Sequence, residues 1–266
     1  MKHRLILFLS LIVLVVLFWI TLPSEKVKVI FCDVGQGDAI LVTYKSWQML
    51  VDTGPNNKKV LSCLSRQMPF WDKTIEVLLI THGDSDHSGG ALDIFKYYKV
   101  GKFFSNGDLN SEIEQKNYSI KLKTFDIIKT NMIYFEIVNS WENYQNGGDE
   151  NEKSIAGILS YMDSAVAGQV TRIFLSGDIT SEVEQRLVWQ KILTKPVDVL
   201  KVSHHGSSSA TSEELLNILK PKMAVISVGV KNRFGHPTKE VLDRLKEKGI
   251  ETRRTDKEGD IILKNF

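Results

Sequence analysis

The sequence predicts an α/β protein, a four-layer α-β-β-α sandwich that follows an N-terminal transmembrane helix. Apolar runs of strand length alternate with runs of helix length along the chain. The first half has strand hairpins followed by strand-helix units, and the second half repeats that order. Two such halves are expected to pack sheet against sheet, with the helices outside. The membrane helix is predicted from one long uncharged run near the N-terminus.

That run, residues 5–22, covers eighteen almost wholly apolar positions. As a helix it would measure about 27 Å, close to the hydrocarbon thickness of a bilayer. Lys2 and Arg4 precede it, and residues 21–24 lack the small-x-small pattern of a cleavage site. We therefore expect a signal anchor over residues 1–24, with the rest of the chain outside the membrane. Cleavage of the segment as a signal peptide, which would give a secreted protein, is the alternative.

Residues 25–266 are predicted to form one domain. The 266-residue chain is 42% hydrophobic and 25% charged, as in ordinary globular proteins, and no low-complexity linker divides it. Its formal net charge of +2 is too small to indicate a binding partner.

In the first half, glycines in the segment Asp33–Asp38 predict a tight turn between the first two strands. A third strand ends at Asp52, and the apolar run Ile75–Ile80 predicts a buried strand. Gly89 and Gly90 then open into a helix. Strands are predicted at 27–32, 39–44, 48–51, 75–80, 102–104 and 133–138, and helices at 58–66 and 91–98.

The second half contains strand-helix units in which each strand ends in a small or polar segment. Leu175 leads into Ser176-Gly177-Asp178, and Val202 leads into a run of histidines and serines. Strands are predicted at 155–161, 170–175, 196–202, 223–228, 251–254 and 260–263, and helices at 181–189, 212–219 and 238–248.

The chain has two cysteines, Cys32 and Cys63. They lack the paired spacing of a zinc-thiolate site. A domain outside the cytoplasm could join them. We nevertheless interpret them as two buried thiols, one in a strand and one in a helix.

Five of the six histidines follow directly after predicted strands, and this clustering predicts a metal site. The densest group places four potential ligands within six residues: His82, Asp84, Asp86 and His87. The first two can hold one ion and the last two a second. Asp178 is expected to bridge the two ions, and His205, in preference to His204, to complete the second position.

This pattern resembles the metallo-β-lactamase fold superfamily. More narrowly, six segments resemble the C-terminal soluble domain of ComEC-type DNA-uptake proteins, and they keep their order along the chain. The resemblance implies the sandwich fold, metal dependence and a role in cutting nucleic acid. The segments are Asp33–Asp38, Val51–Gly54, Thr81–Gly90, Leu175–Asp178, Leu200–Ser207 and Ile226–Pro237.

Two departures from the superfamily pattern H-x-H-x-D-H bear on the metal. Asp84 stands where a histidine is usual, and a carboxylate shifts the preference from Zn²⁺ toward Mn²⁺ or Mg²⁺. No histidine occurs between residues 88 and 203, so Asn151 or Ser154 is expected to face the site instead. We expect two divalent ions, Mn²⁺ or Zn²⁺, with Mg²⁺ as the third candidate.

Asp86, His204 and His236 are the predicted catalytic residues. Asp86 would ligate one ion and orient the attacking nucleophile, and the two histidines would bind the phosphate or protonate the leaving oxygen. For His236, a structural role in a rigid turn is the alternative, and for Gln36 and Asp38 it is turn formation. The predicted substrate-binding residues are Asn151, Ser154, Ser207, Gln36 and Asp38.

Together these features predict a membrane-anchored, extracytoplasmic, binuclear metal-dependent hydrolase that cleaves phosphodiesters, with DNA as the expected substrate. The alternatives are a cell-wall phosphodiesterase, acting on a teichoic acid or phosphocholine-type polymer, and a non-catalytic DNA-binding accessory on the same fold. The intact ligand set counts against the accessory. Because the sequence holds no many-spanning channel region, a separate channel protein is a candidate partner.

Overall fold

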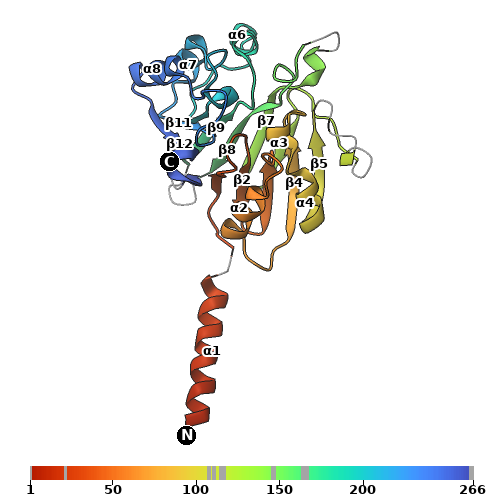
Figure 1. Ribbon diagram of the computed structural model, residues 1–266, viewed down its shortest axis with the longest axis vertical. Helices are drawn as coiled ribbons and strands as arrows, with labels where there is room; N and C mark the ends of the chain where they lie inside the picture. The colour runs from red at the N-terminus through yellow and green to blue at the C-terminus, as the bar shows by residue number, and fades with distance from the viewer. Residues whose placement is uncertain are drawn as a thin grey trace.

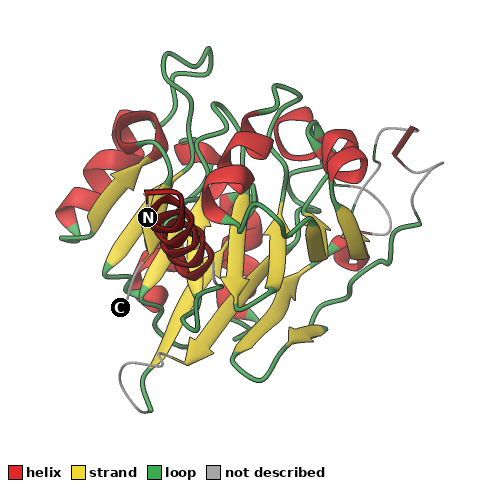
Figure 2. Cartoon of the chain, turned by 90° about the horizontal axis from the view of Figure 1, so that it is seen from below, coloured by secondary structure: helices red, strands yellow, loops and turns green. Residues whose placement is uncertain are grey.

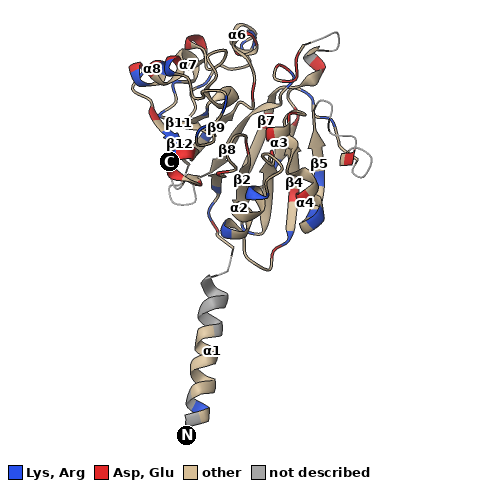
Figure 3. Cartoon of the chain, in the orientation of Figure 1, with Lys and Arg blue, Asp and Glu red and all other residues tan. Residues whose placement is uncertain are grey.

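The computed structural model describes residues 2–20, 23–106, 109, 112–113, 118–144, 148–162 and 168–263. Two sheets lie face to face, with α2 and α4 outside one sheet and α6, α7 and α8 outside the other (Figure 1; Figure 2). The predicted α-β-β-α sandwich is therefore confirmed. Figure 3 shows basic and acidic residues interspersed over the domain, as the small net charge indicates.

The first sheet has six strands and combines two kinds of pairing. From β13 to β3 neighbouring strands are antiparallel, whereas β3, β4 and β5 are parallel. In sheet order the strands are β13 (Ile261–Leu263), β1 (Lys28–Phe31), β2 (Ile40–Tyr44), β3 (Trp47–Val51), β4 (Thr74–Ile80) and β5 (Lys99–Ser105). The helices of this half are α2 (Lys59–Gln67), α3 (Ser85–Ser88) and α4 (Ala91–Tyr97).

The second sheet has seven strands, and β9 to β12 are parallel. In sheet order the strands are β12 (Glu251–Arg254), β11 (Met223–Ile226), β10 (Val199–Lys201), β9 (Val170–Leu175), β8 (Ala156–Met162), β7 (Ile133–Asn139) and β6 (Ile127–Lys129). The helices are α6 (Ser181–Trp189), α7 (Glu213–Leu219), α8 (Lys239–Glu247) and α9 (Thr255–Glu258), with 3-10 turns η1 (Trp141–Tyr144) and η2 (Ser203–Gly206).

Three apolar cores hold the layers together. The central core lies between the sheets and contains Phe31 and Phe135, both almost fully buried. Each outer core fills the space between a sheet and its helices, for example Leu64 of α2 in the first half and Leu215 of α7 in the second. Because strand residues alternate between the two faces of a sheet, one sheet supplies both a central and an outer core.

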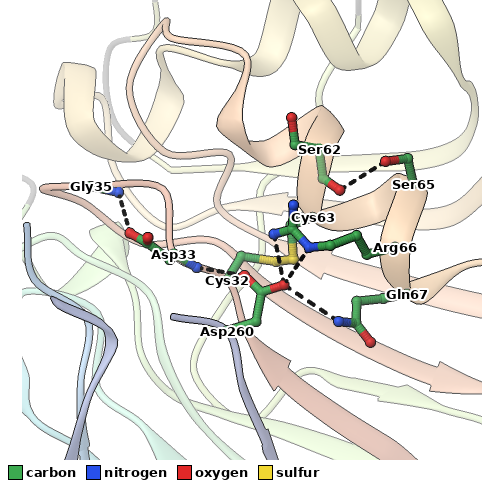
Figure 4. Close-up of a disulfide and its surroundings, with 9 residues drawn as sticks. All are labelled: Cys32, Asp33, Gly35, Ser62, Cys63, Ser65, Arg66, Gln67 and Asp260. Carbon is green, nitrogen blue, oxygen red and sulfur yellow. Dashed lines mark hydrogen bonds and ion pairs between the residues drawn. A yellow bond between two sulfur atoms is a disulfide. The ribbon is translucent and has the colours of Figure 1, made fainter. Parts of the chain in front are cut away.

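Cys32 and Cys63 form a disulfide, so the interpretation as two thiols is wrong (Figure 4). Cys32 follows β1 and Cys63 lies on the buried face of α2. The packing of this helix on the sheet brings their Cα atoms to 5.8 Å, a separation that a disulfide spans. Their spacing of 31 residues in sequence carries no information about this contact.

The helix α1 (Lys2–Ile20) extends away from the sandwich (Figure 1). Several of its apolar side chains are exposed, among them Ile6, Leu7 and Phe8. Within the described part of the chain, no helix meets the length and apolarity needed to cross a bilayer. The signal anchor over residues 1–24 stays a prediction.

Candidate metal centre

The candidate ligands meet because parallel strands of both sheets end at one edge of the sandwich. Asp52 follows β3 and His82 follows β4 in the first sheet. Asp178 follows β9 and His205 follows β10 in the second. The carboxyl ends of parallel strands are where α/β folds place their ligands.

Four donor atoms converge at this edge, and they belong to His87, His205, Asp86 and Asp178. His87 Nε2 lies 3.2 Å from Asp178 Oδ2 and 3.3 Å from His205 Nε2. His205 Nε2 lies 3.3 Å from Oδ2 of both Asp86 and Asp178. Ligands placed tetrahedrally about 2.0–2.1 Å from Zn²⁺ are separated by about 3.4 Å. These four spacings therefore match those expected around one divalent ion.

A second ion would have fewer ligands, and His82 is the clearest of them. Its Nε2 atom is buried and has no hydrogen-bond partner among the described residues. A carboxylate oxygen of the half-exposed Asp84 lies 3.6 Å from it. His82, His87 and Asp178 can also place one donor atom each within 4.8 Å of one another. The position at His82 is therefore the more open of the two.

Hydrogen bonds at Nδ1 orient all three histidines so that Nε2 faces the centre. His87 Nδ1 lies 2.8 Å from Asp52 Oδ2, and His205 Nδ1 lies 2.9 Å from the Ser227 carbonyl oxygen, to which it can donate. His82 Nδ1 lies 3.0 Å from the Thr81 hydroxyl. Such partners set the tautomer and the ring orientation of a metal-binding histidine. The sequence reasoning gave no role to Asp52.

Lys201 is a buried cation at the centre that the sequence reasoning missed. Its Nζ lies 2.6 Å from Asp38 Oδ2, 3.4 Å from Asp178 Oδ1 and 3.0 Å from the Gly177 carbonyl oxygen. The ammonium group thus faces one oxygen of Asp178, while the other faces His87. The available signal was a lysine between two apolar residues, Leu200 and Val202.

The structure places Asp38 against Lys201, where it is almost fully buried. The turn that carries it packs directly on the ligand cluster. The Asp38 N–H donates to the Asp86 carbonyl oxygen at 3.2 Å, and a Cβ at Gly37 would lie 2.1 Å from that oxygen. Only glycine permits this approach, so the turn supports Asp86 as well as reversing the chain.

The carboxylates dominate the electrostatics of the centre. Burial alone would lower the pKa of His87, but Asp178 and Asp52 outweigh it and raise that pKa well above its usual range. Burial would also lower the pKa of His205, but the neighbouring carboxylates, Asp178 above all, outweigh burial and raise this pKa to about 9. Burial opposes ionisation of Asp86, yet His205 and His87 lower its pKa to about 2. Metal binding must therefore displace protons from the histidines.

His204 and His236 form the rim of the centre. His204 and His205 have positive φ angles of 47° and 53°, and this turn lets the two adjacent rings face in different directions. The rings of His204 and His236 meet edge-on, with centroids 5.7 Å apart. Burial lowers the pKa of both residues, so both are neutral at neutral pH. Their Nδ1 atoms have no partner among the described residues.

The other predicted substrate-binding residues lie in different environments. Ser154 is fully buried, and its hydroxyl accepts the Asp178 N–H at 3.2 Å, so it supports a ligand. The Asn151 carbonyl oxygen accepts the Ser154 N–H at 3.0 Å. The Ser207 hydroxyl lies 2.9 Å from that of Ser209. Gln36 lines an open cavity beside the centre.

A further buried carboxylate, Glu184 of α6, holds the segments on both sides of His205. It accepts hydrogen bonds from the Ser203 hydroxyl at 2.9 Å and from the N–H groups of Thr211 and Ser212 at 2.8 and 2.6 Å. The sequence reasoning gave no role to this residue, which lies on the inner face of a helix. It fixes the position of the turn that presents His205.

Comparisons with known proteins agree with the sequence-based resemblance. Residues 32–157 match the family model of the metallo-beta-lactamase superfamily. The chain is 29% identical over 276 residues to ComE operon protein 3 of Bacillus subtilis, covering 94% of this chain and 34% of that protein. It is 28% identical over 237 residues to competence protein ComA of Neisseria gonorrhoeae, covering 89% and 32%. The chain thus spans about a third of the length of the curated relatives it matches.

Among solved structures, Igni18, a metallo hydrolase from Ignicoccus hospitalis, shares the fold. Its TM-score is 0.58 at 18% identity, covering 91% of this chain and 100% of that chain. Asp178 and His205 lie beyond the segment that the family model matches, and the fold brings them to the ligands inside it.

Proposed function

Because the chain carries a metallo-beta-lactamase superfamily domain, we propose that it is a metal-dependent phosphodiesterase that cleaves DNA outside the cytoplasm. The observation that carries this proposal is the convergence of donor atoms from His87, His205, Asp86 and Asp178, four of whose pairwise spacings are 3.2–3.3 Å. The match to the metallo-beta-lactamase superfamily model supports divalent metal chemistry at these residues, and the similarity to a competence protein is consistent with the involvement of DNA.

A divalent ion at this position supplies Lewis-acid stabilisation of a phosphate ester during its hydrolysis. Asp86 is partly exposed, so it can hydrogen-bond a water molecule at the open side of the centre. His204 and His236 are neutral and rim the same edge, where they can donate hydrogen bonds to phosphate oxygens. Lys201 offsets the charge of the buried carboxylates but is too deeply buried to contact a polymer.

The donor set supports Mn²⁺ or Zn²⁺ as the ion in the four-donor position. Two imidazoles and two carboxylates suit either metal, whereas Mg²⁺ prefers sites built from oxygen. We propose a second ion at His82 and Asp84, where the open coordination leaves room for substrate. In this arrangement the second ion binds more weakly than the first.

We also propose that residues 1–24 anchor the domain at the outer face of a membrane. The apolar run 5–22 and the exposed apolar side chains of α1 support the anchor. The disulfide between Cys32 and Cys63 supports an oxidising compartment. A separate channel protein remains the proposed partner for any DNA transport.

The proposal is tested by offering a panel of substrates to the full chain, purified in detergent and loaded with Mn²⁺, Zn²⁺ or Mg²⁺. The panel contains single- and double-stranded DNA and a phosphocholine ester. We expect cleavage of DNA with Mn²⁺ or Zn²⁺, and none of the choline ester. Asp243→Asn, on the exposed face of α8, is the matched control for Asp178→Asn. Intact DNA with every metal, together with turnover of the choline ester, would overturn the proposal in favour of a wall phosphodiesterase.

A further inference from the structure

An open cavity of about 610 Å³ lies beside the metal centre. Asp84, Ser85 and Asp86 line it together with residues 232–234 of the loop after β11, and Gln36 and Pro55 complete the lining. The cavity has the size of a site for a nucleotide-sized ligand. Because Asp86 lines it, the cavity adjoins the proposed cleavage site.

Two exposed residues of the loop offer an aromatic face and a positive charge to that cavity. Phe234 is 51% exposed, and the guanidinium carbon of Arg233 lies 4.9 Å from its ring centroid. Arg233 forms no ion pair with any carboxylate of the described residues. Its charge is therefore available to a ligand. Ligand pockets are typically lined by aromatic side chains and a few polar groups, and this pair of residues matches that description.

Asn232 fixes the shape of the loop before any ligand arrives. Its side-chain oxygen accepts the N–H groups of Phe234 and His236, each at 3.1 Å. Its side-chain nitrogen donates to the carbonyl oxygens of Gly229 at 3.1 Å and His236 at 2.6 Å. A preformed loop loses little conformational entropy when it binds a ligand.

A series of rings connects Phe234 to the metal centre. The Phe234 ring is stacked on His236, with centroids 5.8 Å apart and an interplanar angle of 25°. His236 is followed by His204 at 5.7 Å, and His204 by His205 at 6.3 Å. The aromatic face thus lies next to the rim at which we place the scissile phosphate.

We propose that Phe234 and Arg233 form a subsite for an unpaired nucleotide next to the phosphodiester at the metal centre. The ring of Phe234 stacks on the base, and Arg233 pairs with the adjacent phosphate. The subsite rests on the proposed cleavage of DNA and narrows it to single strands, because the faces of bases in a duplex are covered by their neighbours.

The test measures the affinity of the full chain for two fluorescent oligonucleotides in EDTA, where metal-dependent cleavage does not occur. One is oligothymidine and the other an abasic strand of equal length. We expect the wild type to bind oligothymidine more tightly than the abasic strand. Phe234→Leu should reduce the ratio of the two affinities by about tenfold. Arg233→Gln is expected to weaken binding of both strands and to reduce the salt dependence of binding. Phe70→Leu, at another exposed phenylalanine outside the cavity, is the matched control.

The subsite is disproved if Phe234→Leu keeps the full preference for oligothymidine, or weakens binding of the abasic strand equally. The outcome is separable from that of the proposed function. If the wild type shows this base preference but cleaves no DNA with any metal, the subsite is supported and the proposed nuclease activity is rejected. If the wild type cleaves DNA and Phe234→Leu keeps the full base preference, the nuclease activity is supported and the subsite is rejected.

Discussion

The Nδ1 atom of His87 lies 2.8 Å from a carboxylate oxygen of Asp52. That carboxylate also accepts the N–H and the hydroxyl of Thr81, at 2.7 and 2.8 Å, so its position is fixed by the end of β4. Asp52 therefore fixes the tautomer of His87 and increases its basicity toward a metal.

Replacing Asp52 tests this relationship. Asp52→Asn keeps the size of the side chain but removes the charge that faces the imidazole. We expect metal affinity to fall by about 10–100-fold, measured by calorimetric titration with Zn²⁺ or Mn²⁺. The surface variant Asp243→Asn should bind as the wild type does. Unchanged metal affinity in Asp52→Asn would show that Asp52 does not strengthen metal binding by His87.

Lys201→Met tests the role of the buried ammonium group. The substitution leaves Asp38 and Asp178 without their cation, and breaking a buried pair from one side costs about 3–5 kcal/mol of unfolding free energy. Urea denaturation in EDTA measures this loss. Adding Asp38→Asn should recover part of it, since one of the two unpaired charges is then gone. A single variant as stable as the wild type would contradict this account.

The disulfide is expected to stabilise the domain without shaping the metal centre. It closes a loop of 31 residues, for which the chain-entropy relation gives about 3–4 kcal/mol of unfolding free energy. Replacing Cys32 and Cys63 with alanine should lower stability by that amount in urea and leave metal affinity within twofold. A large loss of metal affinity would show that the bond also positions the ligands.

The buried carboxylate of Glu184 predicts a pH dependence. Burial raises its pKa above 4.5, so protonation favours the folded state. This contribution is fully present below pH 4.5 and is lost as pH rises through the raised pKa. Relative to Glu184→Gln, which does not titrate, the wild type should lose unfolding free energy between acidic and neutral pH. Parallel urea denaturation series measure the difference, and a difference independent of pH would contradict the assignment.

The sequence predicted the sandwich and six candidate ligands because both are local signals. Strand and helix lengths follow from the spacing of apolar residues, and the ligands cluster at strand ends. The partners of those ligands were not predictable in the same way. Asp52, Lys201 and Glu184 are single charged residues in the sequence. Only the fold brings Asp52 to His87 and Lys201 to Asp178, and places Glu184 against Ser203 in the turn that carries His205.

Cys32 and Cys63 show the same limit. Each residue suits a buried position, which favoured two thiols, although the sequence also permits a disulfide. The packing of α2 against the sheet brings the two cysteines close enough to form the disulfide. Phe234 and Arg233 lie in the segment Ile226–Pro237, but the sequence assigned neither a binding role, since one aromatic beside one basic residue is common. Their importance follows from the cavity that they share with Asp86.

The most direct test of the proposed function is the rate of DNA cleavage by the full chain as Mn²⁺ or Zn²⁺ is added to the metal-free protein. Wild type should cleave single-stranded DNA in proportion to the occupancy of the four-donor site, measured in the same samples by metal analysis. His205→Ala removes one of the four donors, so it should lose both the bound ion and at least a hundredfold of the rate. Equal cleavage by wild type and His205→Ala, or a fully loaded wild type that leaves DNA intact, would contradict the account.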